Sequence, residues 1–163
     1  MNVRIIHDSQ AGNGIQLAEA VQDVLRSEGN TVEISHVDQV DGDALAAAPP
    51  DLLIVGAAVR KFSLSGNVRA WLRKLEVHLK QHGTSVPAAA VFLTHGLPSK
   101  VVGGYVTRLR ERLSRVRGVR AVYDTPITAR VIAISGPFEP GTLERVREEA
   151  ARVHQWAKEK AGS

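Results

Sequence analysis

The sequence of 163 residues contains no cysteine, and only 4% of its residues are aromatic. The absence of cysteine excludes disulfides, thiolate-bound zinc, cysteine-ligated iron–sulfur clusters and a cysteine nucleophile, so any redox chemistry must come from a bound cofactor. No apolar run approaches the roughly 20 residues that cross a bilayer, and the first run, at residues 3–6, is too short for a signal peptide. We therefore expect a cytoplasmic protein without a transmembrane segment.

The charge balance excludes little. The 21 Lys and Arg against 17 Asp and Glu leave a net charge of +4, which suits an anionic ligand, a nucleic acid or an ordinary solvated surface. The hydrophobic share of 44% is enough for a sizeable core, and the length is typical of one domain. No repeat or linker divides the chain, so we expect a single domain over residues 1–163.

Apolar runs of strand length alternate with helical patterns along the chain. The predicted strands are residues 3–6, 32–34, 52–55, 88–93 and 131–133. Amphipathic helical stripes are predicted at residues 17–25, 68–79, 102–116 and 143–157, and a short helix is possible at residues 41–46. Strands that alternate with helices indicate an α/β fold with right-handed crossovers and a mostly parallel sheet covered on both faces.

A glycine-containing loop, Asp8-Ser9-Gln10-Ala11-Gly12-Asn13-Gly14, joins the first predicted strand to a helix that is expected to begin near Ile15. Amide groups at a helix start lack intrahelical partners, and glycines let the backbone approach an anion closely, so such loops bind phosphate. The loop is not a dinucleotide fingerprint, because its third glycine would fall at Leu17. A tight turn explains the glycines alone equally well, but the position directly after the first strand favours a ligand.

This strand, loop and helix resemble the phosphate loop of flavodoxins, S/T-x-T-G-N-T, which wraps around the phosphate of FMN. Ser9, Gly12 and Asn13 match that pattern, whereas Ala11 and Gly14 stand where the family usually has hydroxyl side chains. Two missing hydroxyls would weaken the site by roughly 3 to 6 kcal/mol. The resemblance implies a three-layer, doubly wound, five-stranded parallel sheet of order 2-1-3-4-5 with FMN at the switch point.

The resemblance implies contacts to FMN from three segments that follow the first, third and fourth strands, and it assigns no catalytic residue and no metal ligand. Those segments are Ser9, Gln10, Ala11, Gly12, Asn13 and Gly14; Ala57, Ala58, Val59, Arg60, Lys61 and Phe62; and Thr94, His95 and Gly96. A flavin-free module for another phosphorylated ligand stays open as an alternative.

The second segment is basic, whereas flavodoxins of low potential surround the flavin with acidic groups. Residues 56–60 are similar to those of flavodoxin-like protoporphyrinogen oxidases, which use FMN and pass electrons to quinone. A cation at Arg60 or Lys61 near the flavin N1 would stabilise the reduced, anionic flavin and raise its potential. The resemblance thus implies electron transfer or FMN-dependent oxidoreduction with a redox partner protein, a quinone or a small-molecule substrate; a homodimer is possible.

A cluster of arginines suggests a rival function. Six arginines fall within thirteen positions with Glu111 as the sole acid, namely Arg108, Arg110, Arg112, Arg115, Arg117 and Arg120. One helical face of such a cluster could follow nucleic-acid phosphates. No aromatic residues interleave with the arginines, so nucleic-acid binding is the weaker interpretation. A solvated helix face and a docking surface for an acidic redox partner are the alternatives.

His78 and His82 stand four residues apart on a predicted helix, a spacing that can bind zinc. No H-E-x-x-H pattern accompanies them, so we expect a surface pair and no metal site.

Overall fold

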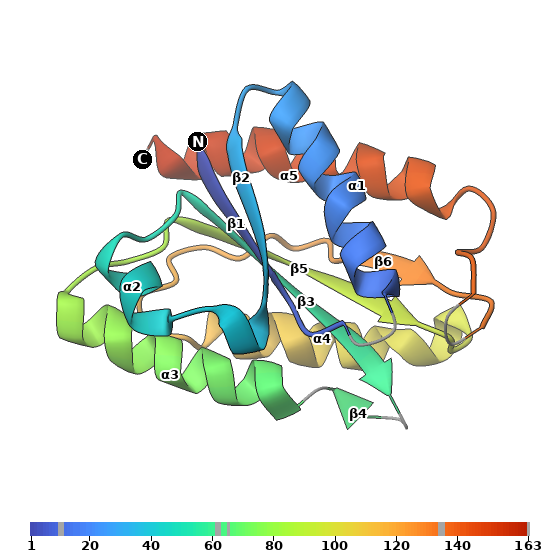
Figure 1. The fold of residues 1–163 in the computed structure, drawn as a ribbon, viewed down its shortest axis with the longest axis horizontal. Helices are drawn as coiled ribbons and strands as arrows, with labels where there is room; N and C mark the ends of the chain where they lie inside the picture. The colour runs from blue at the N-terminus through green and yellow to red at the C-terminus, as the bar shows by residue number, and fades with distance from the viewer. Residues whose placement is uncertain (10–11, 61–62, 65, 134–135, 163) are drawn as a thin grey trace.

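Five parallel strands form the centre of the molecule (Figure 1). The computed structural model describes residues 1–9, 12–60, 63–64, 66–133 and 136–162. The strands follow the order β2-β1-β3-β5-β6 and pair in parallel throughout. They are β1 (Asn2–His7), β2 (Thr31–His36), β3 (Leu52–Arg60), β5 (Ala88–His95) and β6 (Ile127–Arg130). The predicted order 2-1-3-4-5 is confirmed, because β4 (Ser63–Leu64) only adds a short antiparallel pairing to β3.

Helices cover both faces of the sheet and make the three predicted layers (Figure 1). One face carries α1 (Asn13–Ser27) and α5 (Thr142–Ala161), and the other carries α2 (Gly42–Ala47), α3 (Gly66–His82) and α4 (Ser99–Ser114). Each helix turns its apolar stripe toward the sheet, so two separate cores form. Leu17, Val21 and Val153 belong to one core, and Leu75 and Leu109 belong to the other.

Local signals in the sequence fix several helix ends. Gly29 adopts a φ of +79° just after α1, a conformation that glycine reaches without steric cost. The short helix α2 is confirmed; the side chain of Asp41 caps it by accepting a hydrogen bond from the Asp43 N–H at 2.9 Å. A 3-10 turn, η1 (Val37–Gln39), links β2 to this helix.

The last strand lies earlier in the chain than predicted. The sequence indicated residues 131–133, but β6 spans Ile127–Arg130 and pairs His95 with Arg130, where β5 itself ends. Beyond that point Val131 donates one last N–H to the His95 carbonyl at 2.9 Å and forms an isolated bridge to Phe138, and Ile132 is 66% exposed. The prediction was wrong because an apolar run is not a strand when no neighbouring strand continues beside it.

The third strand is longer than predicted. Residues 52–55 were expected as strand, with the ligand segment of residues 57–62 following it, but β3 continues to Arg60, and Val59 pairs with Leu64 of β4. The described part of the second predicted ligand segment, residues 57–60, is therefore the end of a strand. Of that segment, Lys61 and Phe62 and the side chain of Arg60 lie outside the described residues.

Candidate functional site

The carboxyl ends of β1, β3 and β5 meet at one edge of the sheet. The register places His7 beside Gly56, and Ala58 beside Thr94. A narrow crevice lies there that has no room for a water molecule, and it is lined by residues from all three predicted segments: Ser9 and Gly14, Ala57 and Ala58, and Thr94, together with His7, Asp8, Gly56 and Phe92. This edge is where open α/β sheets bind ligands, because the strand order reverses there.

Not every predicted site residue lines that crevice. Gly12 and Asn13 open α1 beside it, and Val59, His95 and Gly96 are described but stand outside its lining. Gln10 and Ala11 lie outside the described residues.

The loop after β1 depends on two glycines. Gly12 has a φ of +85° and precedes the first turn of α1, where its carbonyl accepts hydrogen bonds from the N–H groups of Ile15 and Gln16, each at 3.1 Å. Gly14 donates its N–H to Ser9 Oγ at 3.0 Å, and a Cβ atom on Gly14 would lie 2.7 Å from the Ser9 Cβ. A hydroxyl side chain, which flavodoxin loops usually carry at this position, has no room here. Gly14 therefore departs from the flavodoxin pattern because Ser9 packs so closely against it.

Asp8 and His7 reinforce the loop, and the sequence interpretation assigned neither to the site. Asp8 is 2% exposed, and its Oδ1 accepts a hydrogen bond from the Ala58 N–H at 3.2 Å, which ties the first segment to β3. His7 Nδ1 accepts a hydrogen bond from the Ser9 N–H at 3.1 Å. The sequence signal was position alone, because both residues directly follow the first apolar strand.

The ring of His7 is held in a buried environment. It meets the His36 ring edge to face, with the ring centroids 5.4 Å apart. Burial and then the neighbouring His36 lower the pKa of His7, while Asp8 raises it. A neutral His7 that carries its proton on Nε2 leaves Nδ1 free to accept the Ser9 N–H that shapes the loop.

A close contact between β3 and β5 forms the floor of the crevice. Gly56 pairs with Phe92, and a Cβ atom on Gly56 would lie 1.9 Å from the ring carbon Cζ of Phe92. Phe92 is 1% exposed, so its ring cannot swing into solvent. Only glycine fits at position 56, because the Phe92 ring occupies the space where a side chain would lie.

His95 ends β5 as a buried residue, whereas the sequence left open a loop histidine. It is 4% exposed, and its Nδ1 donates to the Leu97 carbonyl at 2.9 Å. Burial, the larger influence, lowers the pKa of His95; the Leu97 carbonyl raises it, and Arg130 lowers it further. Arg130 is itself paired with Glu139 at 3.2 Å. His95 therefore anchors the third segment.

The histidine pair of α3 contacts a carboxylate from α2. Asp43 Oδ1 lies 2.8 Å from His82 Nε2 and 3.2 Å from His78 Nδ1. The hydrogen bond from His82 is the main reason that the pKa of Asp43 is lowered. The pair thus joins α2 to α3.

Fold and edge together define an α/β protein of the flavodoxin type, and comparisons with known proteins agree. A family model described as flavodoxin domain matches residues 4–116. The chain belongs to the flavodoxin domain family, a family of FMN-binding electron-transfer flavoproteins. No curated protein matches the sequence.

Solved structures share this fold at low identity. Flavodoxin 1 of Bacillus cereus is 19% identical with a TM-score of 0.70, and the alignment covers 95% of this chain and 98% of that one. A WrbA-like flavodoxin of Agrobacterium tumefaciens is 17% identical with a TM-score of 0.69, covering 98% of each chain.

A rubredoxin oxygen:oxidoreductase of Desulfovibrio gigas is 18% identical with a TM-score of 0.74. The alignment covers 99% of this chain but only 37% of that much longer one. Across the part of the chain that the structure describes, no helix has the length and apolar content needed to cross a membrane.

Proposed function

We propose that this chain binds FMN at the edge where β1, β3 and β5 end and acts in electron transfer or flavin-dependent oxidoreduction. The observation that carries this proposal is the meeting of Ser9 and Gly14, Ala57 and Ala58, and Thr94 around one crevice at the switch point of the sheet. Membership of the flavodoxin domain family supports the same ligand.

The FMN phosphate would bind at the start of α1. Gly12 leaves open space where a side chain would stand, since nothing lies within 4 Å of its Cβ position, so an anion can reach the helix-opening amides. The Ser9 hydroxyl and Asn13, which belong to the same loop, would add hydrogen bonds to the phosphate. The flavin ring would lie over the ends of β3 and β5, against the backbone of Ala57, Ala58 and Val59 and near Thr94, His95 and Gly96.

One feature of the edge opposes a dianion. Asp8 is a buried carboxylate directly before the phosphate loop, and like charges repel strongly where water is excluded. The hydroxyls missing at Ala11 and Gly14 act in the same direction. We therefore expect weaker FMN binding than the full family loop provides, and a different phosphorylated ligand is the second candidate for the same loop.

Bound FMN would supply reversible transfer of electrons, and the chain would hold and orient it. Arg60 and Lys61 follow Val59 at the end of β3, so we propose that they raise the midpoint potential and suit the protein to a quinone, a small-molecule substrate or a redox partner. Replacing Arg60 with Gln should lower the midpoint potential in a spectroelectrochemical titration. A midpoint potential that is very low and is not changed by Arg60→Gln would contradict the proposed role of Arg60 and Lys61.

The test is a fluorescence titration of the purified protein with FMN and with riboflavin, which lacks the phosphate. FMN should bind at least tenfold more tightly, and Ser9→Ala should reduce that preference while leaving riboflavin affinity unchanged. Ser114→Ala is the matched control, because this exposed hydroxyl only bonds the Glu111 carbonyl of its own helix. Equal affinity for the two flavins, or none for either, would overturn the proposal.

Three further points stay predictions. They are the organisation of residues 1–163 as one domain, a cytoplasmic location and a homodimer.

A further inference from the structure

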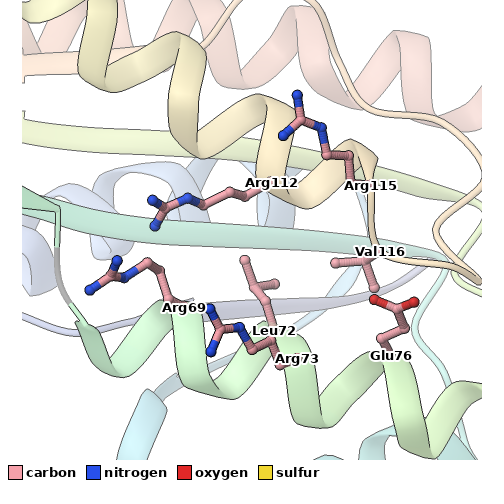
Figure 2. Close-up of a pocket in the computed structure, with 7 residues that line it drawn as sticks. All are labelled: Arg69, Leu72, Arg73, Glu76, Arg112, Arg115 and Val116. Atoms are coloured by element: carbon pink, nitrogen blue, oxygen red, sulfur yellow. The ribbon is translucent and has the colours of Figure 1, made fainter.

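A groove between α3 and α4 is lined by arginines from both helices (Figure 2). Its volume is about 190 Å³. Arg69 and Arg73 come from α3, Arg112 comes from α4, Arg115 caps the C-terminal end of α4, and Glu76 is the one carboxylate of the described lining. Figure 2 shows Arg112 reaching from α4 toward the two arginines of α3. The sequence identified the arginines of α4 but gave no sign that those of α3 lie opposite them.

The carboxylates of Glu76 and Glu111 are paired with arginines other than Arg69, Arg73 and Arg112. Glu76 lies 3.8 Å from Arg117, which does not line the groove, and Glu111 lies 3.6 Å from Arg115. Among the described residues, no ion pair joins Arg69, Arg73 or Arg112 to a carboxylate. Three guanidinium groups therefore share a groove in which the one carboxylate of the described lining, Glu76, forms an ion pair with none of them.

Arg112 stands out among them because part of its head group is buried. Its Nη1 atom is inaccessible to solvent and has no hydrogen-bond partner within the described part of the chain. Burial is the main cause that lowers the pKa of Arg112, followed by the positive charges of Arg69, Arg108 and Arg73. Desolvating a cation beside other cations without an acceptor costs free energy, so the apo groove is electrostatically unfavourable.

An anion with several oxygens would relieve this. The guanidinium group is planar and offers parallel N–H donors that match phosphate oxygens, and such charge-assisted hydrogen bonds are about twice as strong as neutral ones. Leu72 and Val116 give the groove an apolar floor, which strengthens electrostatic contacts above it. Concavity, donors and an excess of positive charge thus occur together at this place.

We propose that the groove between α3 and α4 binds a phosphorylated small molecule, with its phosphate held by Arg69, Arg73 and Arg112. This site is separate from the crevice at the sheet edge, because none of its lining residues belongs to β1, β3 or β5. The proposal does not depend on FMN binding.

A nucleic acid fits the same surface less well. The remaining arginines of the α4 run do not form a continuous strip, since Arg110 pairs with Asp124 at 2.6 Å and Arg117 pairs with Glu76. Arg108 packs its guanidinium over the Tyr105 ring at 5.8 Å. Three of the unpaired charges therefore converge on one small groove, which favours a compact anion over an extended polyanion.

The experiment is a calorimetric titration of the full chain with inorganic pyrophosphate at low ionic strength. Binding should weaken roughly tenfold or more in Arg112→Gln, because a hydrogen bond to a charged group is lost. A double variant, Arg69→Gln with Arg73→Gln, should weaken pyrophosphate binding to a similar extent. Both arginines are exposed on α3, so this variant replaces Arg112→Gln in the test if Arg112→Gln folds poorly. Arg147→Gln, an exposed arginine of α5 on the opposite face of the sheet, is the matched control and should change affinity less than twofold.

The phosphate loop at Gly12 must be distinguished from the groove. Pyrophosphate binding that disappears in Gly12→Val and persists in the arginine variants would place the anion at the sheet edge and overturn the proposal. So would no binding by the natural chain. A single-stranded oligonucleotide that binds more tightly than pyrophosphate, and weakens equally in Arg108→Gln and Arg120→Gln, would identify the surface as a nucleic-acid site instead.

Discussion

The crevice at the sheet edge and the groove between α3 and α4 recognise anions by different means. At the edge, backbone amides and glycines form the site, and its polar side chains accept hydrogen bonds from backbone N–H groups: Asp8 from that of Ala58, His7 from that of Ser9, and Ser9 from that of Gly14. In the groove, recognition rests on flexible side chains, and Arg112 carries an N–H group without a partner. The edge is preorganised, whereas the groove stores unfavourable charge repulsion until an anion arrives.

This contrast has a consequence for mutation. A preorganised backbone site is sensitive to conformation, so small steric changes at glycines should have the largest effects. A side-chain site is sensitive to charge, so its changes should be graded and should depend on salt.

The largest effect is expected from Gly12→Val. A β-branched residue at a φ of +85° is strained, although the space around Cβ is open, so the loop must change its backbone path. FMN affinity should fall at least 100-fold in a fluorescence titration. Gly12→Asn is the control, because asparagine accepts a positive φ and should retain most of the affinity. Unchanged FMN binding by the valine variant would mean that the phosphate lies elsewhere.

Gly56→Ala tests the floor of the edge. The added Cβ would meet the buried ring of Phe92, so the free energy of unfolding should fall by roughly 1–3 kcal/mol in denaturant unfolding. Combining it with Phe92→Leu should recover part of the loss. Gly103→Ala in α4 is the matched control: nothing lies within 4 Å of its Cβ position, so it should stabilise the protein by about 0.5–1 kcal/mol. Equal effects at both positions would contradict the tight strand contact.

Asp8→Asn should tighten FMN binding. The amide oxygen of Asn can still accept the Ala58 N–H, while the negative charge that opposes the phosphate disappears. A charge a few ångströms away contributes about 1 kcal/mol or more, so affinity should rise roughly tenfold. Riboflavin affinity should not change, which serves as the internal control. A tenfold loss of FMN affinity would show that Asp8 positions the loop and does not repel the ligand.

Acid should weaken the edge through His7. The pKa of His7 is lower in the folded protein than in the unfolded chain, where it is about 6.5, because folding favours the neutral ring. Protonation of His7 therefore does not reduce the folding stability above about pH 6.5, and it reduces that stability as the pH falls below this value. As the pH falls through the lowered pKa, Nδ1 takes a proton, the Ser9 N–H loses its acceptor, and FMN affinity should fall. His36 and Asp8 face the same ring and shift the midpoint in opposite directions.

His7→Asn is the matched variant for the pH titration, because the asparagine side chain offers an acceptor that does not titrate. Its FMN affinity should change much less between pH 7.5 and pH 5. A pH dependence identical to that of the natural chain would exclude His7 as its origin. Burial also lowers the pKa values of His95 and His154, so global unfolding should be measured separately over the same range.

The sequence predicted the inner strands well because each is buried on both faces and is therefore a continuous apolar run. It failed at β6, where only Ile127 and Ala129 are buried and the longer apolar run at residues 131–133 has no strand beside it. The three ligand segments could be found because parallel strands end at one edge. Their geometry could not, since Gly14 is constrained by Ser9 and Gly56 by Phe92 across the fold.

The arginine groove was beyond sequence reasoning for a related reason. Helical spacing shows which residues of α4 share a face, but it does not show which helix lies opposite. Arg69 and Arg73 are ordinary exposed residues of α3 until the packing of α3 beside α4 places them across from Arg112. A site made from two helices that are not joined by a motif requires the fold.

The smallest effect is expected from Arg112→Met. The sign of its effect on the free energy of unfolding distinguishes the groove, which is expected to be destabilising without an anion, from the preorganised sheet edge. Methionine keeps most of the apolar contact while removing a cation that has a buried N–H without a partner, so the free energy of unfolding should rise by about 0.5–1 kcal/mol. In millimolar pyrophosphate the order should reverse, because only the natural chain gains binding energy. Arg115→Met, whose side chain is 78% exposed, should change stability by less than about 0.5 kcal/mol. Destabilisation by Arg112→Met without pyrophosphate would show that Arg112 is a structural residue, and the stored repulsion in the groove would not exist.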